Sequence, residues 1–160
     1  MGRIRHIYHL VFVTKGRRMT IPTAEKAVML DRMRRIFTGK GCRVYAVNAF
    51  LNHAHVLVEI PKNDDFSRVV NKVKSATGMV YQKYPEYAAF SGWAAGFDSF
   101  SVSFGDLERV RRHIERQQVI HQDISFEEEY GQLLEENGFD PRQTSIPASS
   151  PAFADGNSNT

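Results

Sequence analysis

The sequence contains almost no cysteine, since Cys42 is the only one among 160 residues. A single thiol excludes an internal disulfide framework and is typical of a protein of the reducing cytosol. Long apolar runs are also missing, because no stretch approaches the roughly 18–20 residues that cross a bilayer. No hydrophobic signal region follows the first residues of the chain. We therefore expect a cytoplasmic protein without a membrane-spanning segment.

The sequence also lacks the bias of a disordered chain, because 42% of its residues are hydrophobic and 24% are charged. Its length suits one domain with a proper core. A net charge of +3 is only mildly basic, so the distribution of charge is more informative. The basic residues gather in three groups, which are Lys15, Arg17 and Arg18; Arg32, Arg34, Arg35, Lys40 and Arg43; and Arg109, Arg111, Arg112 and Arg116. Such groups can neutralise the phosphates of a nucleic acid, although any one of them alone is more simply a solvated helix face.

Hydrophobic periodicity predicts four strands and four helices. The expected strands are residues 6–14, 43–50, 53–60 and 97–104, and the expected helices are residues 21–39, 66–84, 106–121 and 125–137. The link at Leu51 and Asn52 is short enough to make the second and third strands an antiparallel hairpin. Ser125 and Glu128 resemble a capping box that opens the last helix.

This order of elements is the βαββαβ pattern of an α+β, ferredoxin-like sandwich with an antiparallel sheet, followed by extra helices. We expect a domain over residues 1–139, with the sheet open on one face to receive a nucleic-acid strand, as in RNA-recognition domains. Residues 140–160 are rich in Pro, Ser, Ala, Gly and Asn, so we expect a disordered tail there.

His53 and His55 are separated by one residue on an expected strand, so both imidazoles project to the same side, roughly 6.5–7 Å apart. Two imidazoles at this spacing can bind one divalent cation. A bare His-x-His is more often two surface histidines. Here the pair leads directly into the buried run that begins at Val56, which favours a built site.

The late helix supplies further polar groups. His113, Gln117 and His121 follow one another at intervals of four residues and so form one stripe. The neighbouring stripe of Leu107, Val110 and Ile114 would pack the helix on the sheet, and the polar stripe could then face the histidine pair. Taken alone, the polar stripe is more simply a solvated surface than a ligand set.

Five collinear segments resemble the single-tyrosine transposases of the HUH superfamily, which include insertion-sequence transposases and the REP-associated tyrosine transposases. The segments are YHLVFVTKGR (8–17), NHAHVLV (52–58), VKS (73–75), WAAGF (93–97) and IERQ (114–117). The resemblance extends from about residue 4 to residue 139.

The resemblance implies a mechanism. In this family two histidines and a glutamine hold Mg²⁺ or Mn²⁺ against the scissile phosphate of single-stranded DNA, often near a hairpin. A tyrosine one helical turn before the glutamine attacks the phosphorus, forms a 5′-phosphotyrosyl intermediate and releases a 3′-hydroxyl. Carried over, His53, His55 and Gln117 become metal ligands, and the chain functions in strand cleavage and rejoining during DNA transposition.

The sequence departs from the family at one decisive position. The nucleophilic tyrosine should lie four residues before Gln117, where this chain has His113. Three alternatives follow. His113 could attack as an imidazole; another tyrosine (Tyr81, Tyr84 or Tyr130) could be delivered; or the protein binds metal and DNA but cleaves poorly or not at all, which is the alternative we favour.

The residues expected to contact DNA phosphates are Lys15, Arg17, Arg18, Lys72, Lys74, Arg112 and Arg116. The amphipathic segment 125–139 is expected to dock on the domain or on a second subunit, and some relatives are homodimers. Two other functions stay open. One is a non-catalytic single-stranded nucleic-acid-binding protein, and the other is a hydrolase of small phosphate compounds that uses His53, His55, His113 and His121.

Overall fold

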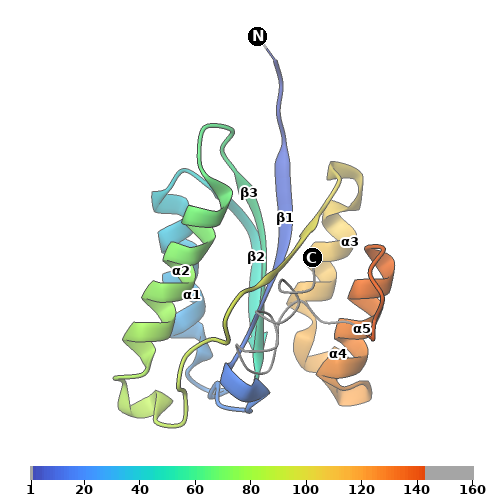
Figure 1. Ribbon diagram of the computed structural model, residues 1–160. Coiled ribbons are helices and arrows are strands. Elements are labelled where there is room, and N and C mark those ends of the chain that lie inside the picture. Colours follow the sequence, from blue (N-terminus) through green and yellow to red (C-terminus); the bar gives the residue numbers. More distant parts are fainter. Residues whose placement is uncertain (1, 143–160) are drawn as a thin grey trace, which may run out of the picture.

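The structure is a computed structural model that describes residues 2–142. The four strands are β1 (His6–Val13), β2 (Arg43–Phe50), β3 (His53–Ile60) and β4 (Asp98–Ser101). The helices are α1 (Lys26–Gly39), α2 (Phe66–Tyr81), α3 (Leu107–Glu115), α4 (Gln117–Asp123) and α5 (Phe126–Glu136). The sheet order is β2-β3-β1-β4, and every neighbouring pair is antiparallel (Figure 1). The predicted α+β, ferredoxin-like fold is confirmed.

One face of the sheet is covered by α1 and α2 and forms an apolar layer. Every second residue of β3, from Ala54 to Ile60, points to this side and is buried. Phe12 from β1 lies between the rings of Trp93 and Phe97, with centroid separations of 5.8 and 6.2 Å. Burial of these apolar side chains is the main stabilising contribution of this layer.

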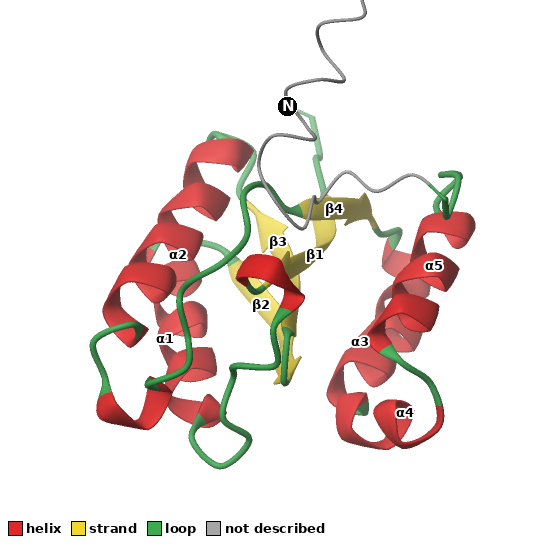
Figure 2. Ribbon diagram, turned by 60° about the horizontal axis from the view of Figure 1, so that its bottom comes forward, coloured by secondary structure: helices red, strands yellow, loops and turns green. Residues whose placement is uncertain are grey.

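The other face of the sheet is covered by α3, α4 and α5, as Figure 2 shows. Leu107, Val110 and Ile114 of α3 pack against Leu57, as their spacing predicted. The expectation that one face stays open for a nucleic-acid strand is therefore wrong. The C-terminal helices bury it because α5 carries an apolar stripe of its own, which contacts Val11 and Val13.

The late helix is not continuous, which corrects the prediction of one helix over 106–121. Arg116 leaves the helical conformation, with φ −100° and ψ 23°, and separates α3 from α4. The break frees backbone carbonyls that a continuous helix would satisfy. The Asn48 side chain on β2 donates to two of them, at 2.9 Å to Ile114 O and 3.3 Å to Glu115 O. Such a polar partner satisfies the carbonyls that the helix break leaves free.

Several element boundaries also differ from the prediction, and α2 ends at Tyr81 rather than at residue 84. Helix α1 begins at Lys26 rather than near residue 21, because the Ile21 amide donates to Leu51 O at 2.8 Å and ties that segment to the hairpin turn. Strand β4 is shorter than expected and ends at Ser101. The predicted hairpin between β2 and β3 and the cap of α5 are both present, with the Glu128 amide donating to Ser125 Oγ at 3.1 Å.

The predicted disordered tail lies mostly outside the described residues. Within residues 2–142, no helix combines the length and the apolar character that crossing a membrane requires.

Candidate metal centre

His53 and His55 lie on the face of β3 that α3, α4 and α5 cover. Both side chains are fully buried, and their ring centroids are 5.0 Å apart. The strand alternation that directs Ala54 and Val56 into the apolar layer directs the two histidines to the opposite side. The predicted convergence of this pair is therefore present.

Each imidazole is oriented by a hydrogen bond at its Nδ1 atom. His53 Nδ1 lies 2.9 Å from Asn52 Oδ1, which accepts, so Nδ1 carries the proton. His55 Nδ1 lies 2.8 Å from His9 Nε2, and His9 is itself buried on β1. In both rings the Nε2 atom is directed toward the C-terminal helices. Metal-binding histidines are commonly held in this way, by a hydrogen bond at the ring nitrogen that faces away from the ion, which fixes the ring and its tautomer.

The polar stripe of the late helix faces the histidine pair despite the break at Arg116. Gln117 is fully buried, and its Oε1 atom lies 2.8 Å from His53 Nε2. His121 Nε2 lies 3.2 Å from His53 Nε2 and 3.1 Å from Gln117 Oε1. The His121 ring stacks on Phe50, which fixes its plane.

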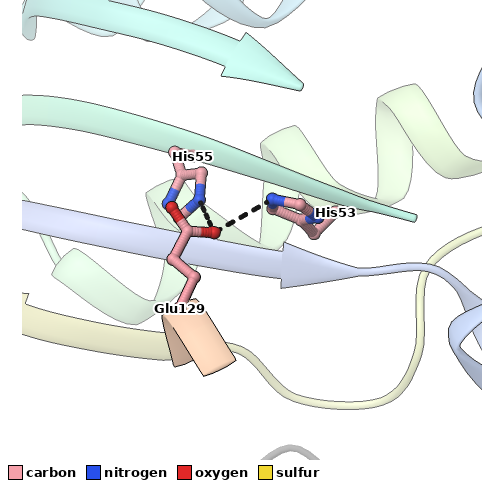
Figure 3. A group of neighbouring side chains, drawn as sticks. All are labelled: His53, His55 and Glu129. Carbon is pink, nitrogen blue, oxygen red and sulfur yellow. Dashed lines mark hydrogen bonds and ion pairs between the residues drawn. The ribbon is translucent and has the colours of Figure 1, made fainter. Parts of the chain in front are cut away.

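Glu129 of α5 belongs to this cluster and was not predicted from the sequence. Its carboxylate is fully buried, and Oε1 lies 3.3 Å from both His53 Nε2 and His55 Nε2 (Figure 3). The same oxygen lies 3.1 Å from His121 Nε2. The second oxygen accepts from Gln117 Nε2 and from His113 Nε2, both at 2.6 Å. One carboxylate thus contacts the four histidines and Gln117 that surround it.

A signal for Glu129 was present in the sequence. It belongs to an acidic run, 127–129, which at a helix N-terminus is typically solvated and favoured by the helix dipole. However, Glu129 lies three residues after Phe126 and four before Leu133, so it falls on the buried stripe of α5. A carboxylate on an apolar stripe requires a buried partner. His9 was also missed, because the sequence around it is typical of an apolar core strand.

The protonation states suit a cation site. Burial, with a smaller contribution from the neighbouring His55, lowers the pKa of His53 to about 4. Burial also lowers the pKa of His9 well below its ordinary value. For Glu129, burial alone would raise the pKa, but His55, His113 and His53 together hold the pKa of this carboxyl well below its usual range. At neutral pH the site therefore presents neutral imidazole from His53 beside a carboxylate, the forms in which these groups ligate metals.

The residue at the expected tyrosine position, His113, lies at the edge of the site. Its side chain is 32% exposed, and its Nε2 atom is hydrogen-bonded to Glu129 Oε2. A cavity of about 210 Å³ lies beside it, with His9, His113 and Glu129 among its lining residues. Position 113 is thus the part of the cluster that a solute can approach.

None of the other tyrosines considered as nucleophiles lies at the position that His113 occupies. Tyr81 is buried on the opposite face of the sheet, where its hydroxyl donates to Val28 O at 3.1 Å. Tyr84 packs beside Tyr81 and so belongs to that same layer. Tyr130 follows Glu129 on α5, and its ring stacks on Phe126, which in turn stacks on His53.

The predicted DNA-contacting residues fall on two sides of the molecule. Lys15 and Lys74 line one shallow pocket on the α2 side, near Trp93. Lys74 Nζ is engaged there, donating to Ala94 O at 2.8 Å and to Gly96 O at 2.7 Å. Arg112 and Arg116 are exposed on the α3 and α4 side instead. Of the remaining three, Arg18 and Lys72 are exposed, whereas the Arg17 guanidinium lies over the Tyr130 ring at 5.6 Å.

The side chains present fit a divalent cation. His53, His55 and Glu129 each offer a ligand atom, and these atoms lie within 4.8 Å of one another. Imidazole nitrogen and carboxylate oxygen are common ligands of Zn²⁺, Mn²⁺ and related ions. All three residues are buried, as are the Asn52 and His9 side chains that orient the two rings.

A family model described as IS200-like transposase matches residues 3–117. The chain belongs to this transposase family. A transposase-type function follows, in the class of DNA-cleaving enzymes, and the resemblance read from the sequence is confirmed. The matched region includes His53, His55, His113 and Gln117 but stops before Glu129, so α5 lies outside the part that the family model describes.

Solved structures share the fold of this transposase-family chain. A candidate transposase from Deinococcus radiodurans R1 is 21% identical with a TM-score of 0.55, covering 73% of this chain and 96% of that one. A REP-associated tyrosine transposase bound to a REP hairpin is 15% identical with a TM-score of 0.59, covering 78% of this chain and 74% of that one. At these identities the likeness shows the fold alone. No curated protein sequence matches the chain.

Proposed function

We propose that this chain binds single-stranded or hairpin DNA at a divalent-metal centre held by His53, His55 and Gln117, and that its strand cleavage is impaired. The observation that carries the proposal is the 2.8 Å contact between His53 Nε2 and Gln117 Oε1, both fully buried, in a member of a transposase family. The hairpin-bound structural relative supports hairpin DNA as the ligand.

Mg²⁺ or Mn²⁺ is the ion that the family resemblance favours. A divalent ion at these residues would stabilise charge on the phosphate oxygens and orient the leaving group. The chain itself contributes the orientation of the ligands, through Asn52 at His53 and His9 at His55.

We infer impaired cleavage from the residue at position 113, which has no hydroxyl group. A single-tyrosine transposase requires a hydroxyl there, whereas His113 offers an imidazole whose Nε2 atom is bonded to Glu129. That hydrogen bond opposes direct attack by His113 through Nε2. Tyr81 and Tyr84 belong to the layer on the other face of the sheet, which argues against either as a substitute.

The test uses a labelled hairpin oligonucleotide from the sequence that flanks the gene, with Mn²⁺. The unmodified protein is expected to bind the hairpin without nicking it. The His113→Tyr variant, alone and with Glu129→Gln to release residue 113 from the carboxylate, is expected to nick the strand and to become covalently attached to its 5′ phosphate. His6→Asn, at an exposed histidine of β1, is the matched control.

Two outcomes would contradict the proposal. If the unmodified protein cleaves, another nucleophile operates, and His113→Phe and Tyr130→Phe identify it. If no variant binds the hairpin, the DNA function is wrong for this chain. Binding without cleavage by either tyrosine variant would leave the alternative function, a non-catalytic single-stranded nucleic-acid-binding protein.

Phosphate contacts are proposed for Lys15, Lys72 and Lys74 on the α2 side, for Arg17 and Arg18 in the segment after β1, and for Arg112 and Arg116 on the α3 and α4 side. Lys15→Ala with Arg18→Ala should weaken hairpin binding and reduce the slope of log affinity against log salt by about 0.7–0.9 per lost contact. Arg112→Ala with Arg116→Ala is the matched comparison, and the pair with the larger change in slope marks the DNA-facing side.

A homodimer stays a prediction. In the described chain, α5 docks on its own domain.

A further inference from the structure

Four atoms that carry lone pairs face one another at the centre of the site. His53 Nδ1 donates to Asn52 Oδ1, and His121 Nδ1 donates to the Ile124 carbonyl at 3.0 Å. In their neutral forms, both rings therefore have an unprotonated Nε2. These two nitrogens lie 3.2 Å apart.

The two oxygens beside them are acceptors as well. Gln117 Nε2 donates to Glu129 Oε2 at 2.6 Å, so the amide oxygen is the atom that faces His53 and His121. Glu129 Oε1 completes the group. When both rings are neutral, these four atoms are all acceptors and repel one another, and a cation between them removes that repulsion.

The spacing of these atoms is that of ligands around one metal ion. Five pairwise distances join the Nε2 atoms of His53 and His121 and the Oε1 atoms of Gln117 and Glu129. The shortest is 2.8 Å, between His53 and Gln117, and the longest is 3.3 Å, between His53 and Glu129. Metal–ligand bonds of about 2.0–2.2 Å place neighbouring ligand atoms about 2.8–3.1 Å apart in octahedral geometry and about 3.3–3.6 Å apart in tetrahedral geometry. His55 Nε2, 3.3 Å from Glu129 Oε1, adds a fifth atom at the same spacing.

We propose that His121 and Glu129 are additional ligands of the ion at His53, His55 and Gln117. The protein itself then fills five of the six positions of an octahedral coordination shell. This inference rests on the metal centre of the proposed function and specifies its ligands. Three imidazoles favour a transition-metal ion such as Zn²⁺ or Mn²⁺ over Mg²⁺, which prefers oxygen ligands and retains water. The cavity beside His113 and Glu129 supplies an entry path for the ion.

The number of protein ligands has a consequence for DNA. Sites that act on substrates keep an open coordination position, whereas structural sites are closed by protein ligands. Five protein ligands leave one position of an octahedral shell for a phosphate oxygen. A second phosphate oxygen reaches the ion only when a protein ligand such as Glu129 leaves it.

The test measures metal binding and bound water rather than activity. Purified full-length protein is loaded with Mn²⁺, and the relaxation of water protons reports how many water molecules the ion holds. Affinities for Mn²⁺ and Zn²⁺ come from competition with a chelator. Glu129→Gln preserves the shape of the side chain, and His121→Phe preserves the stack on Phe50. The matched controls are Glu127→Gln, at an exposed position of α5, and His6→Asn.

Both site variants should bind Mn²⁺ and Zn²⁺ at least about tenfold more weakly, with higher water relaxation per bound Mn²⁺, while the controls match the unmodified protein. Circular dichroism of the chelated proteins verifies that each variant is folded. If both variants keep the affinity and the water relaxation of the unmodified protein, His121 and Glu129 are not ligands, and the inference is wrong even where Mn²⁺-dependent hairpin binding persists. If the metal results hold but no hairpin binds, the proposed function fails and the ligand assignment stands.

Discussion

The two faces of the sheet are built from the same strands but have opposite chemistry. Toward α1 and α2, β3 presents Ala54, Val56, Val58 and Ile60, and the described core residues of this layer include no histidine, acidic or basic side chain. Toward α3, α4 and α5, the same strand presents His53 and His55, which meet Gln117 and Glu129. The period of two residues in a strand lets one face stabilise the fold while the other holds the chemistry.

The largest effect is expected on the apolar face. Phe12→Ala removes a fully buried ring between Trp93 and Phe97 and should lower the free energy of unfolding by about 3–5 kcal/mol. Urea denaturation measures the loss. Met79→Ala, at a 64% exposed position of α2, is the control and should change the free energy by less than about 0.5 kcal/mol. Equal losses would show that this layer does not carry the stability.

A smaller loss is expected on the polar face when metal is removed. In chelated protein, Glu129→Ala leaves the buried donors of Gln117 and His113 without their acceptor, which should cost about 1–3 kcal/mol. Glu127→Ala on the same helix should have no measurable effect. A Glu129→Ala protein as stable as the unmodified chain would mean that the carboxylate is retained for the ion rather than for the fold.

The cap of α5 sharpens the comparison further. Ser125→Ala removes the oxygen that accepts from the Glu128 amide and should destabilise α5 by about 1 kcal/mol. Amide hydrogen exchange should rise in α5 and remain unchanged in α2, whose own cap is Asp65. A uniform rise across both helices would show that the two layers unfold together instead of separately.

The smallest effect concerns reactivity rather than stability. Cys42 is buried in the apolar layer, and burial, with the charge of Asp64 adding to it, raises the pKa of its thiol from 9.0 to about 11. The thiolate is the reactive form, so at pH 8 alkylation of the folded protein should be about a hundredfold slower than in denaturant. Equal rates would indicate that the layer opens readily around Cys42.

The fold was largely predictable because its signals are local. Alternation identified the strands, and the short link at Leu51 and Asn52 identified the hairpin. The break at Arg116 was not predictable, since its stabilising partner is Asn48, a residue of β2 distant in sequence. Local spacing alone favours one continuous helix there.

The site was predictable in part for the same reason. His53 and His55 share a strand, and Gln117 and His121 share a stripe, so their spacing carries information. Glu129 differs because its partners lie on β3, α3 and α4, and only the packing of α5 brings it to them. Its place on the apolar stripe of α5 marked it as buried but could not name its partners.

Metal binding by Glu129 would also add a cross-link between distant parts of the chain. This protein has one cysteine and hence no internal disulfide. An ion that joins His55 to Glu129 links residues 74 positions apart and closes that segment into a loop. A cross-link over such a span restricts the unfolded chain and contributes about 4 kcal/mol in the manner of a disulfide. The ion would then be a reversible cross-link that a reducing environment does not cleave.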